Sequence, residues 1–313
     1  MKYIRKISLS IAALLVLAII IAGILYFRKN VEVKTLDAVA RKDASGSFIQ
    51  LSDGITHYEL AGPDTGRLVL LVHGFSVPYY IWDSTFNFLV KNGFRVLRYD
   101  EFGRGYSDRP EKVYDAALYR QQVSELLAKL NIPTVYAIAG LSFGSAVVTD
   151  FTLHNLRMVN KIILIDPVYP GDFHMSGPES WVKYKMALSP EDRANGQLED
   201  LKYPNNFPTW AEQYKVQMQY KGFTNALVST RFHYAPEGGI RSNYRALDAL
   251  HKPVLLVWGI EDKTVPYSFS DSLRHILKTT FVLVKDAAHL PHMEQPGLVN
   301  DRILSFLNQR ENF

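Results

Sequence analysis

One serine lies between two glycines at the end of an apolar run, in the segment Gly140-Leu141-Ser142-Phe143-Gly144. A serine hydroxyl is a weak nucleophile at neutral pH, and it needs a base within hydrogen-bond reach that is itself oriented by an acid. A glycine-x-serine-x-glycine pattern also occurs by chance, and a serine before a helix can simply cap it. Here the apolar run before the serine and the small residues after it predict the strand, turn and helix that expose a nucleophile.

Candidate bases and acids follow the last two apolar runs of the chain. His289 and His292 come after the final run, and Glu261 and Asp262 come after the run before it. Asp166, which also follows an apolar run, is the rival of Asp262 as the acid. If these runs are parallel strands, their carboxyl ends meet at one edge of the sheet, and all of these side chains converge there.

Six short, continuous apolar runs alternate with amphipathic stretches from residue 68 onward. They cover residues 68–73, 95–100, 134–140, 161–166, 253–259 and 280–286. Runs that are apolar on both faces are typical of buried parallel strands, and helical patterns between them predict an α/β fold with a doubly wound, mostly parallel sheet. Before them, Ser52-Asp53-Gly54 between two strand-like segments predicts a hairpin.

One interval in this alternation is far longer than a crossover between strands needs. Roughly 80 residues separate the fourth and fifth runs, which indicates an inserted domain. We expect a helical cap over residues 167–250, rich in aromatic side chains. Most of these aromatic residues should form the cap's own core, and a minority should line the cavity beneath it.

Four ordered motifs resemble the α/β-hydrolase superfamily. They are His73-Gly74-Phe75, the 140–144 segment, Gly259-Ile260-Glu261-Asp262 and His289-Leu290-Pro291. The chain is most similar to the cap-bearing serine esterase/lipase branch, and it is also similar to the carbon–carbon-bond hydrolases. The resemblance covers roughly residues 47–310, and the order of the four motifs makes it specific where each alone is weak.

The resemblance implies a catalytic triad of Ser142 as nucleophile, Asp262 as acid and His289 as base. It also implies that the backbone N–H groups of Phe75 and Phe143 form the oxyanion hole. We expect the bulky ring of Phe143 to make the acyl side of the pocket narrower and more apolar.

Several neighbouring residues are expected to have structural roles. His292 would pack or hydrogen-bond beside the site, and Glu294 would anchor the histidine loop. The segment 99–110 resembles a structural turn of the family, in which Asp100 and Ser107 hydrogen-bond to backbone.

The N-terminus carries an uncharged apolar segment, Ile7 to Phe27, that is 21 residues long and flanked by basic residues. This length can span a bilayer, and no small-x-small cleavage site follows closely. We therefore expect one uncleaved transmembrane helix in residues 1–30, with the body on the extracytoplasmic side. The hydrolase core would then comprise residues 31–166 and 251–313, on either side of the cap insert.

Composition excludes other classes. The net charge of +4 comes from five basic residues in the first 30, which leaves 30 basic against 31 acidic residues in the rest, a charge of −1. This balance disfavours a nucleic-acid-binding face. The chain has no cysteine, and no metal-ligand spacing or dinucleotide fingerprint is present. We expect no cofactor and no metal.

Together these features predict a membrane-associated serine hydrolase of carboxylic esters that works through an acyl-enzyme. The expected substrate is a small lipophilic ester such as an acylglycerol. Two alternatives stay open: a carbon–carbon-bond hydrolase of a vinylogous diketone, and a non-catalytic ligand-binding homologue. The absence of an obvious basic cluster in the cap disfavours the diketone.

Overall fold

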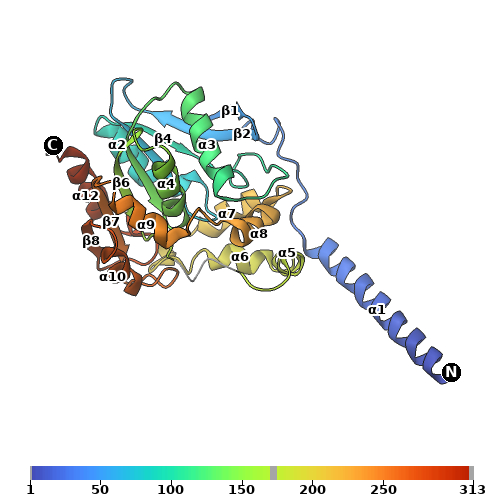
Figure 1. Ribbon diagram of the computed structural model, residues 1–313. Helices are drawn as coiled ribbons and strands as arrows, with labels where there is room; N and C mark the ends of the chain where they lie inside the picture. Colours follow the sequence, from blue (N-terminus) through green and yellow to red (C-terminus); the bar gives the residue numbers. More distant parts are fainter. Residues whose placement is uncertain (1, 170–174, 310–313) are drawn as a thin grey trace.

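The computed structural model describes residues 2–169 and 175–309. Eight strands form one sheet in the order β1-β2-β4-β3-β5-β6-β7-β8 (Figure 1). The strands are β1 (Ser47–Leu51), β2 (Gly54–Ala61), β3 (Leu68–Val72), β4 (Arg95–Tyr99), β5 (Val135–Leu141), β6 (Val159–Ile165), β7 (Val254–Gly259) and β8 (Thr280–Val284). The strands from β4 to β8 in this order pair in parallel, and β2 pairs antiparallel with both β1 and β4. The predicted doubly wound, mostly parallel sheet is confirmed.

The sheet carries a hydrophobic core on each face. In β3, Leu68, Leu70 and Val72 contact the core that also contains side chains of helices α3 (Ala116–Lys129), α4 (Phe143–His154) and α10 (Ser268–Arg274). Val69 and Leu71 contact the opposite core, which contains helices α2 (Asp83–Lys91) and α12 (Pro296–Asn308). Alternate side chains of a strand point to opposite faces, so a strand covered on both sides is apolar throughout.

Between β6 and β7, in the stretch that we predicted as a cap, the described residues form five α-helices. They are α5 (Glu179–Leu188), α6 (Pro190–Gly196), α7 (Trp210–Met218), α8 (Phe223–His233) and α9 (Ile240–Asp248), with the short 3₁₀ helix η2 (Pro204–Asn206) between α6 and α7. Helices α5 to α8 pack on one another. Helix α9 instead packs against α4, where Tyr244 and Leu247 join the core of the sheet. In this article "the cap" means residues 175–234.

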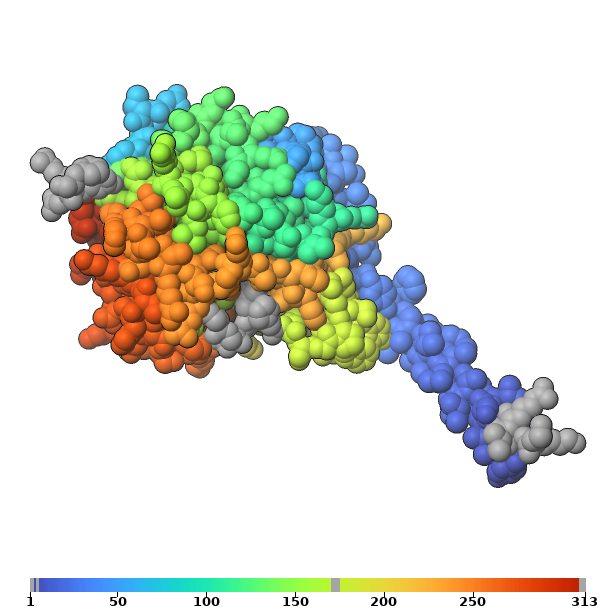
Figure 2. Space-filling view, in the orientation of Figure 1, coloured from blue at the N-terminus to red at the C-terminus, as the bar shows by residue number. Residues whose placement is uncertain are grey.

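Helix α1 (Lys2–Lys29) projects from the body as a straight rod (Figures 1 and 2). Its residues 6–29 are long and apolar enough to cross a membrane, and none of them is buried in the body. The segment that follows is attached to the body. The Glu32 carboxylate accepts the N–H groups of Gly222 and Thr224 at 2.8 and 2.7 Å, and Lys34 exchanges backbone hydrogen bonds with residues 219–221. Chain 30–34 is therefore bound to the start of α8.

Candidate active site

Ser142 lies at the turn between β5 and α4 in a backbone conformation that non-glycine residues rarely adopt. Its φ is +50° and its ψ is −118°. Such strain persists only where the surrounding structure imposes it. Both flanking glycines are required by close backbone approach: a Cβ on Gly140 would lie 2.5 Å from the Gly144 carbonyl oxygen, and one on Gly144 would lie 2.3 Å from that of His73. The turn lifts the serine hydroxyl to the edge of the sheet, where Ser142 lines a cavity of about 250 Å³.

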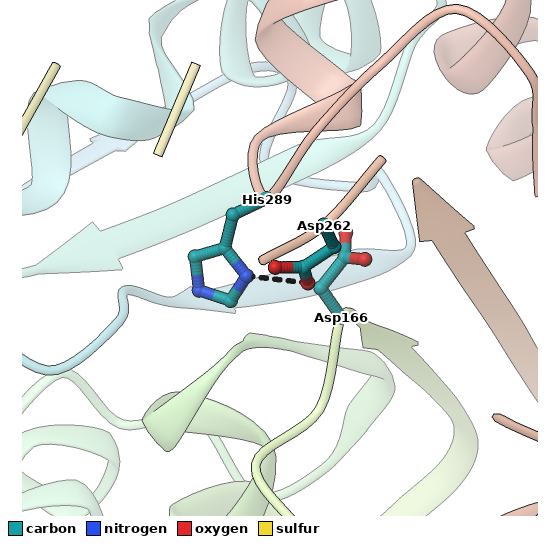
Figure 3. A group of neighbouring side chains, drawn as sticks. All are labelled: Asp166, Asp262 and His289. Carbon is teal, nitrogen blue, oxygen red and sulfur yellow. Dashed lines mark hydrogen bonds and ion pairs between the residues drawn. The ribbon is translucent and has the colours of Figure 1, made fainter. Parts of the chain in front are cut away.

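His289 lines the same cavity and is bonded to Asp262 (Figure 3). Its Nδ1 lies 2.7 Å from Asp262 Oδ2, and both side chains are buried. The other carboxylate oxygen, Oδ1, accepts the backbone N–H groups of Thr264 and Val265, both at 2.8 Å. The loop that carries the candidate acid Asp262 therefore fixes its position. Of the two ring nitrogens of His289, Asp262 bonds only to Nδ1, so Nε2 is not involved in this pair.

Two opposing effects set the pKa of His289. Burial disfavours the charged imidazolium, but the charge and hydrogen bond of Asp262, together with the charge of Asp200, outweigh it. They raise the pKa of His289 to about 8. A histidine with this pKa accepts a proton readily, and Asp262 stabilises the imidazolium that forms.

Asp166 faces Asp262 rather than serving as the partner of His289 (Figure 3). It ends β6 with a φ of +41°, and its Oδ1 accepts the Gly259 N–H at 2.9 Å. Burial, followed by the nearby charge of Asp262, raises the pKa of Asp166 well above its usual value. This shift favours the protonated form of Asp166, which avoids two adjacent buried negative charges.

The other acid and base candidates from the sequence do not bond to His289 or Asp262. Glu261 bonds to the exposed Lys202. The Nε2 of His292 lies 3.0 Å from the Ile81 carbonyl, and burial lowers the pKa of His292 to about 3. His292 is thus a neutral packing residue. Glu294 accepts the N–H of Ala288 at 2.7 Å, which ties down the loop that carries His289.

The oxyanion-hole candidates Phe75 and Phe143 line the cavity beside Ser142, and their rings meet edge to face with centroids 6.1 Å apart. The Phe75 loop is held rigidly. His73 Nδ1 lies 2.7 Å from the Gly74 carbonyl, and its Nε2 accepts the Glu101 N–H at 2.9 Å. Burial lowers the pKa of His73 to about 4, which keeps this ring neutral.

Arg104, which the sequence reasoning did not single out, supports the same loop from behind. Its Nε donates to the Phe75 carbonyl at 2.9 Å, and its other nitrogens bond to Phe102, Tyr119 and Thr230. The only sequence signal was a charged residue between the two glycines of the 99–110 turn. In that turn Asp100 accepts backbone N–H groups and Ser107 bonds to backbone, so their expected structural roles are confirmed.

The cap contributes polar residues to the cavity. Gln197, Asp200 and Arg231 line it, whereas none of the described cap aromatic residues does. Cap aromatic residues line two other cavities between cap and core instead: Tyr220 lines one, and Phe207 and Trp210 line the other. The aromatic rings pack within the cap or against the body because their area stabilises it there. The Asp200 carbonyl accepts the His289 N–H at 3.0 Å, so this cap loop also supports the base.

Comparison with known proteins identifies the fold and its family. Residues 69–302 match the model of the alpha/beta hydrolase family, and the chain belongs to it. It is 25% identical over 281 residues to AB hydrolase superfamily protein YfhM of Bacillus subtilis, covering 83% of this chain and 96% of that protein. An esterase from Exiguobacterium antarcticum superposes with a TM-score of 0.69 at 19% identity, covering 84% of this chain and 100% of that one.

A meta-cleavage product hydrolase from Pseudomonas fluorescens has a similar fold. It superposes with a TM-score of 0.68 at 23% identity, covering 84% of this chain and 97% of that one. Other relatives have names as different as epoxide hydrolase and non-heme chloroperoxidase. The family establishes the fold and the hydrolase class, and the site has to specify the reaction.

Proposed function

We propose that this chain is a membrane-anchored serine hydrolase that cleaves carboxylic esters through an acyl-enzyme. One observation carries the proposal: the strained Ser142 shares a cavity with His289, whose Nδ1 is bonded to the buried Asp262. Nucleophilic serine catalysis requires these three residue types in this relation.

In the proposed reaction, His289 takes the proton of the Ser142 hydroxyl as the serine oxygen attacks the ester carbonyl. The N–H groups of Phe75 and Phe143 stabilise the resulting oxyanion. The C–O bond to the alcohol then breaks, and His289 passes its proton to the leaving alkoxide. Water, deprotonated by His289, cleaves the acyl-enzyme in the same way, while Asp262 stabilises the imidazolium in both halves.

The two walls of the cavity suit an ester with unlike ends. Apolar side chains of the core form one wall, from Val77, Ile81, Val168, Val265 and Leu290. Gln197, Asp200 and Arg231 of the cap form the other. We assign the acyl group to the apolar wall and the hydroxylated alcohol to the polar wall, as in an acylglycerol. The volume of about 250 Å³ is small for a ligand pocket and favours short acyl chains.

Arg231 supports a second candidate, hydrolysis of a carbon–carbon bond in a vinylogous diketone. The sequence had no obvious basic cluster for the carboxylate of such a substrate, but the fold brings this arginine into the cavity. By contrast, the elbow position of Ser142 disfavours epoxide hydrolysis, because an aspartate nucleophile is required there.

Helix α1 supports membrane attachment, since residues 6–29 satisfy the length and hydropathy of a span. We propose that it is an uncleaved anchor with the body on the extracytoplasmic side.

The test is the initial rate of the full chain in detergent with p-nitrophenyl esters of increasing acyl length, compared with Ser142→Ala. We expect hydrolysis that declines for long chains and falls at least 10³-fold in the variant. Equal rates for both proteins would contradict serine catalysis. A Ser142-dependent rate with a vinylogous diketone and none with any ester would instead select the second candidate.

A further inference from the structure

Cap helix α5 packs against the last turns of α1. The Tyr184 hydroxyl donates to the Ala22 carbonyl at 3.1 Å. The ring of Tyr184 is stacked between those of Tyr26 and Trp181, with centroid distances of 6.4 and 5.5 Å. Trp181 itself is 54% exposed. This small aromatic stack therefore joins the body to the apolar helix and presents an indole ring to the outside.

The position of Ala22 along α1 fixes the depth of this contact. Ala22 lies inside the apolar window of residues 6–29 and seven residues before Lys29. A helix rises about 1.5 Å per residue, so Ala22 is roughly 10 Å below the charged end of the helix. A bilayer core of about 30 Å takes up about 20 residues, so Ala22 lies below the headgroups when α1 spans it. A body helix bonded to Ala22 must then lie at the membrane boundary.

We propose that α5 lies in the interfacial layer of a phospholipid bilayer, as a second membrane contact beside the anchor. This inference rests on the proposed anchor and is independent of the proposed chemistry. Its partner is the lipid surface, which tryptophan and tyrosine favour because one part of each ring system is apolar and the other is polar.

The two sides of α5 fit this placement. Val182 and Ala187 are buried against the body, whereas Trp181 and Lys185 are exposed. A lysine at this depth extends its ammonium group toward the lipid phosphates. The anchor adds Arg28 and Lys29 in its own last turn.

This contact would also bring the active site close to the bilayer. Helix α5 packs on α8 and α6. Those helices contribute Arg231 and Gly196 to the cavity lining. Glu32 also binds the segment after α1 to the start of α8. The anchor and the cap are therefore joined at two places, through Tyr184 and through Glu32. The polar wall of the cavity is thus one helix away from the lipid, which suits a substrate that partitions into the membrane.

Tryptophan fluorescence of the full chain in lipid vesicles tests the proposal. Trp82, Trp210 and Trp258 are buried at 0%, 4% and 0% exposure, so Trp181 alone is open to its surroundings among the four. In phosphatidylcholine and phosphatidylglycerol vesicles, lipids brominated near the headgroup should remove roughly half of the Trp181 emission. Trp181→Phe should lose this quenching.

A matched control places the reporter on the opposite side of the body. Leu298 is 42% exposed and belongs to α12, a helix that lies far from α1 (Figure 1). In the Trp181→Phe, Leu298→Trp double variant, brominated lipid should leave the emission unchanged and aqueous iodide should quench it.

Three results would overturn the proposal. The first is equal iodide quenching of Trp181 and of the reporter at position 298, with no effect of brominated lipid. The second is lipid quenching that is absent at a high protein-to-lipid ratio and appears only when the protein is diluted with lipid, which would indicate that a second copy covers α5. The third is release of the chain from vesicles by alkaline carbonate, which would remove the anchor as well. Repeating the measurement with Ser142→Ala separates it from the chemistry, because that variant should give the same quenching without hydrolysis.

Discussion

The two walls of the cavity are built differently. The wall on the side of the sheet consists of residues in the segments after strand ends, and backbone hydrogen bonds help to hold these segments, as the N–H groups of Thr264 and Val265 hold Asp262. The wall formed by the cap comes from a helix end, a loop and α8, which carry Gln197 and Arg231. We expect the first wall to fix the chemistry and to tolerate little change, and the second to select the substrate. The predictions below test that division.

Replacing the acid should have the largest effect. Asp262→Asn should lower kcat by about 10⁴-fold, because an amide cannot stabilise the His289 imidazolium and favours the wrong tautomer. Asp166→Asn should cost less than tenfold, since a neutral amide replaces a neutral carboxyl there. Steady-state kinetics measures both, with Glu261→Gln as a control of unchanged rate. Equal losses for Asp166→Asn and Asp262→Asn would show that the two carboxyls act as a unit.

Removing Arg104, which supports the loop that carries Phe75, should have the second-largest effect on kcat. Arg104→Met deletes the hydrogen bond to the Phe75 carbonyl, and we expect kcat to fall about 10²-fold with little change in KM, because the loop amide is needed only in the transition state. Arg109→Met is the matched control, since Arg109 is partly buried and bonds to the carbonyl groups of Ser107 and Gly105 in the same turn. If both variants lose stability and kcat alike, the role of Arg104 is general stabilisation.

The free energy of unfolding should distinguish the turn at Ser142 from the cap. Gly144→Ala forces a Cβ to 2.3 Å from a backbone oxygen, and it should lower the free energy of unfolding by about 3 kcal/mol. Gly196→Ala in the cap has open space around it and should change this free energy by less than about 1 kcal/mol, in the stabilising direction. Thermal denaturation followed by circular dichroism measures both. A tolerated Gly144→Ala would mean that the elbow can relax.

The smallest expected effect is a shift in pH dependence. His289 acts as a base only when neutral, so kcat/KM should rise with pH and level off above a midpoint of about 8. The charge of Asp200 raises the pKa of His289, so Asp200→Asn should move this midpoint to lower pH by a fraction of a unit. The pH profile of kcat/KM for both proteins is the measurement. An unchanged midpoint would show that the cap has no electrostatic influence on the base.

Much of the sheet could be predicted from the sequence because its signals are local. A strand buried on both faces is apolar at every position, as in residues 68–72, and this pattern is visible without a structure. The candidate triad could be predicted from the sequence for a related reason. Functional residues at the carboxyl ends of parallel strands converge in space, so their place in the sequence predicts their place in the site.

The sequence predicted that a cap is inserted, but not which of its side chains line the cavity. Its aromatic residues were visible, but which of them would face the cavity depends on how four helices pack, and the described ones pack elsewhere. The same holds for Arg104, whose role arises from contacts with residues as distant in the chain as Thr230. Long-range contacts of this kind leave no periodicity in the sequence.

The sequence by itself determined the parallel strands along the chain, the elbow at Ser142, and a terminal helix apolar enough to span a membrane, because a short window of residue types predicts each of them. The order of the strands in the sheet came from the tertiary structure. The family resemblance favoured Asp262 over Asp166, but both follow strands, and only the pairing of β6, β7 and β8 sets their distances to His289. The tertiary structure also decided that the cap presents polar side chains to the cavity and that α5 lies against α1. Burial and packing of distant segments determine those choices.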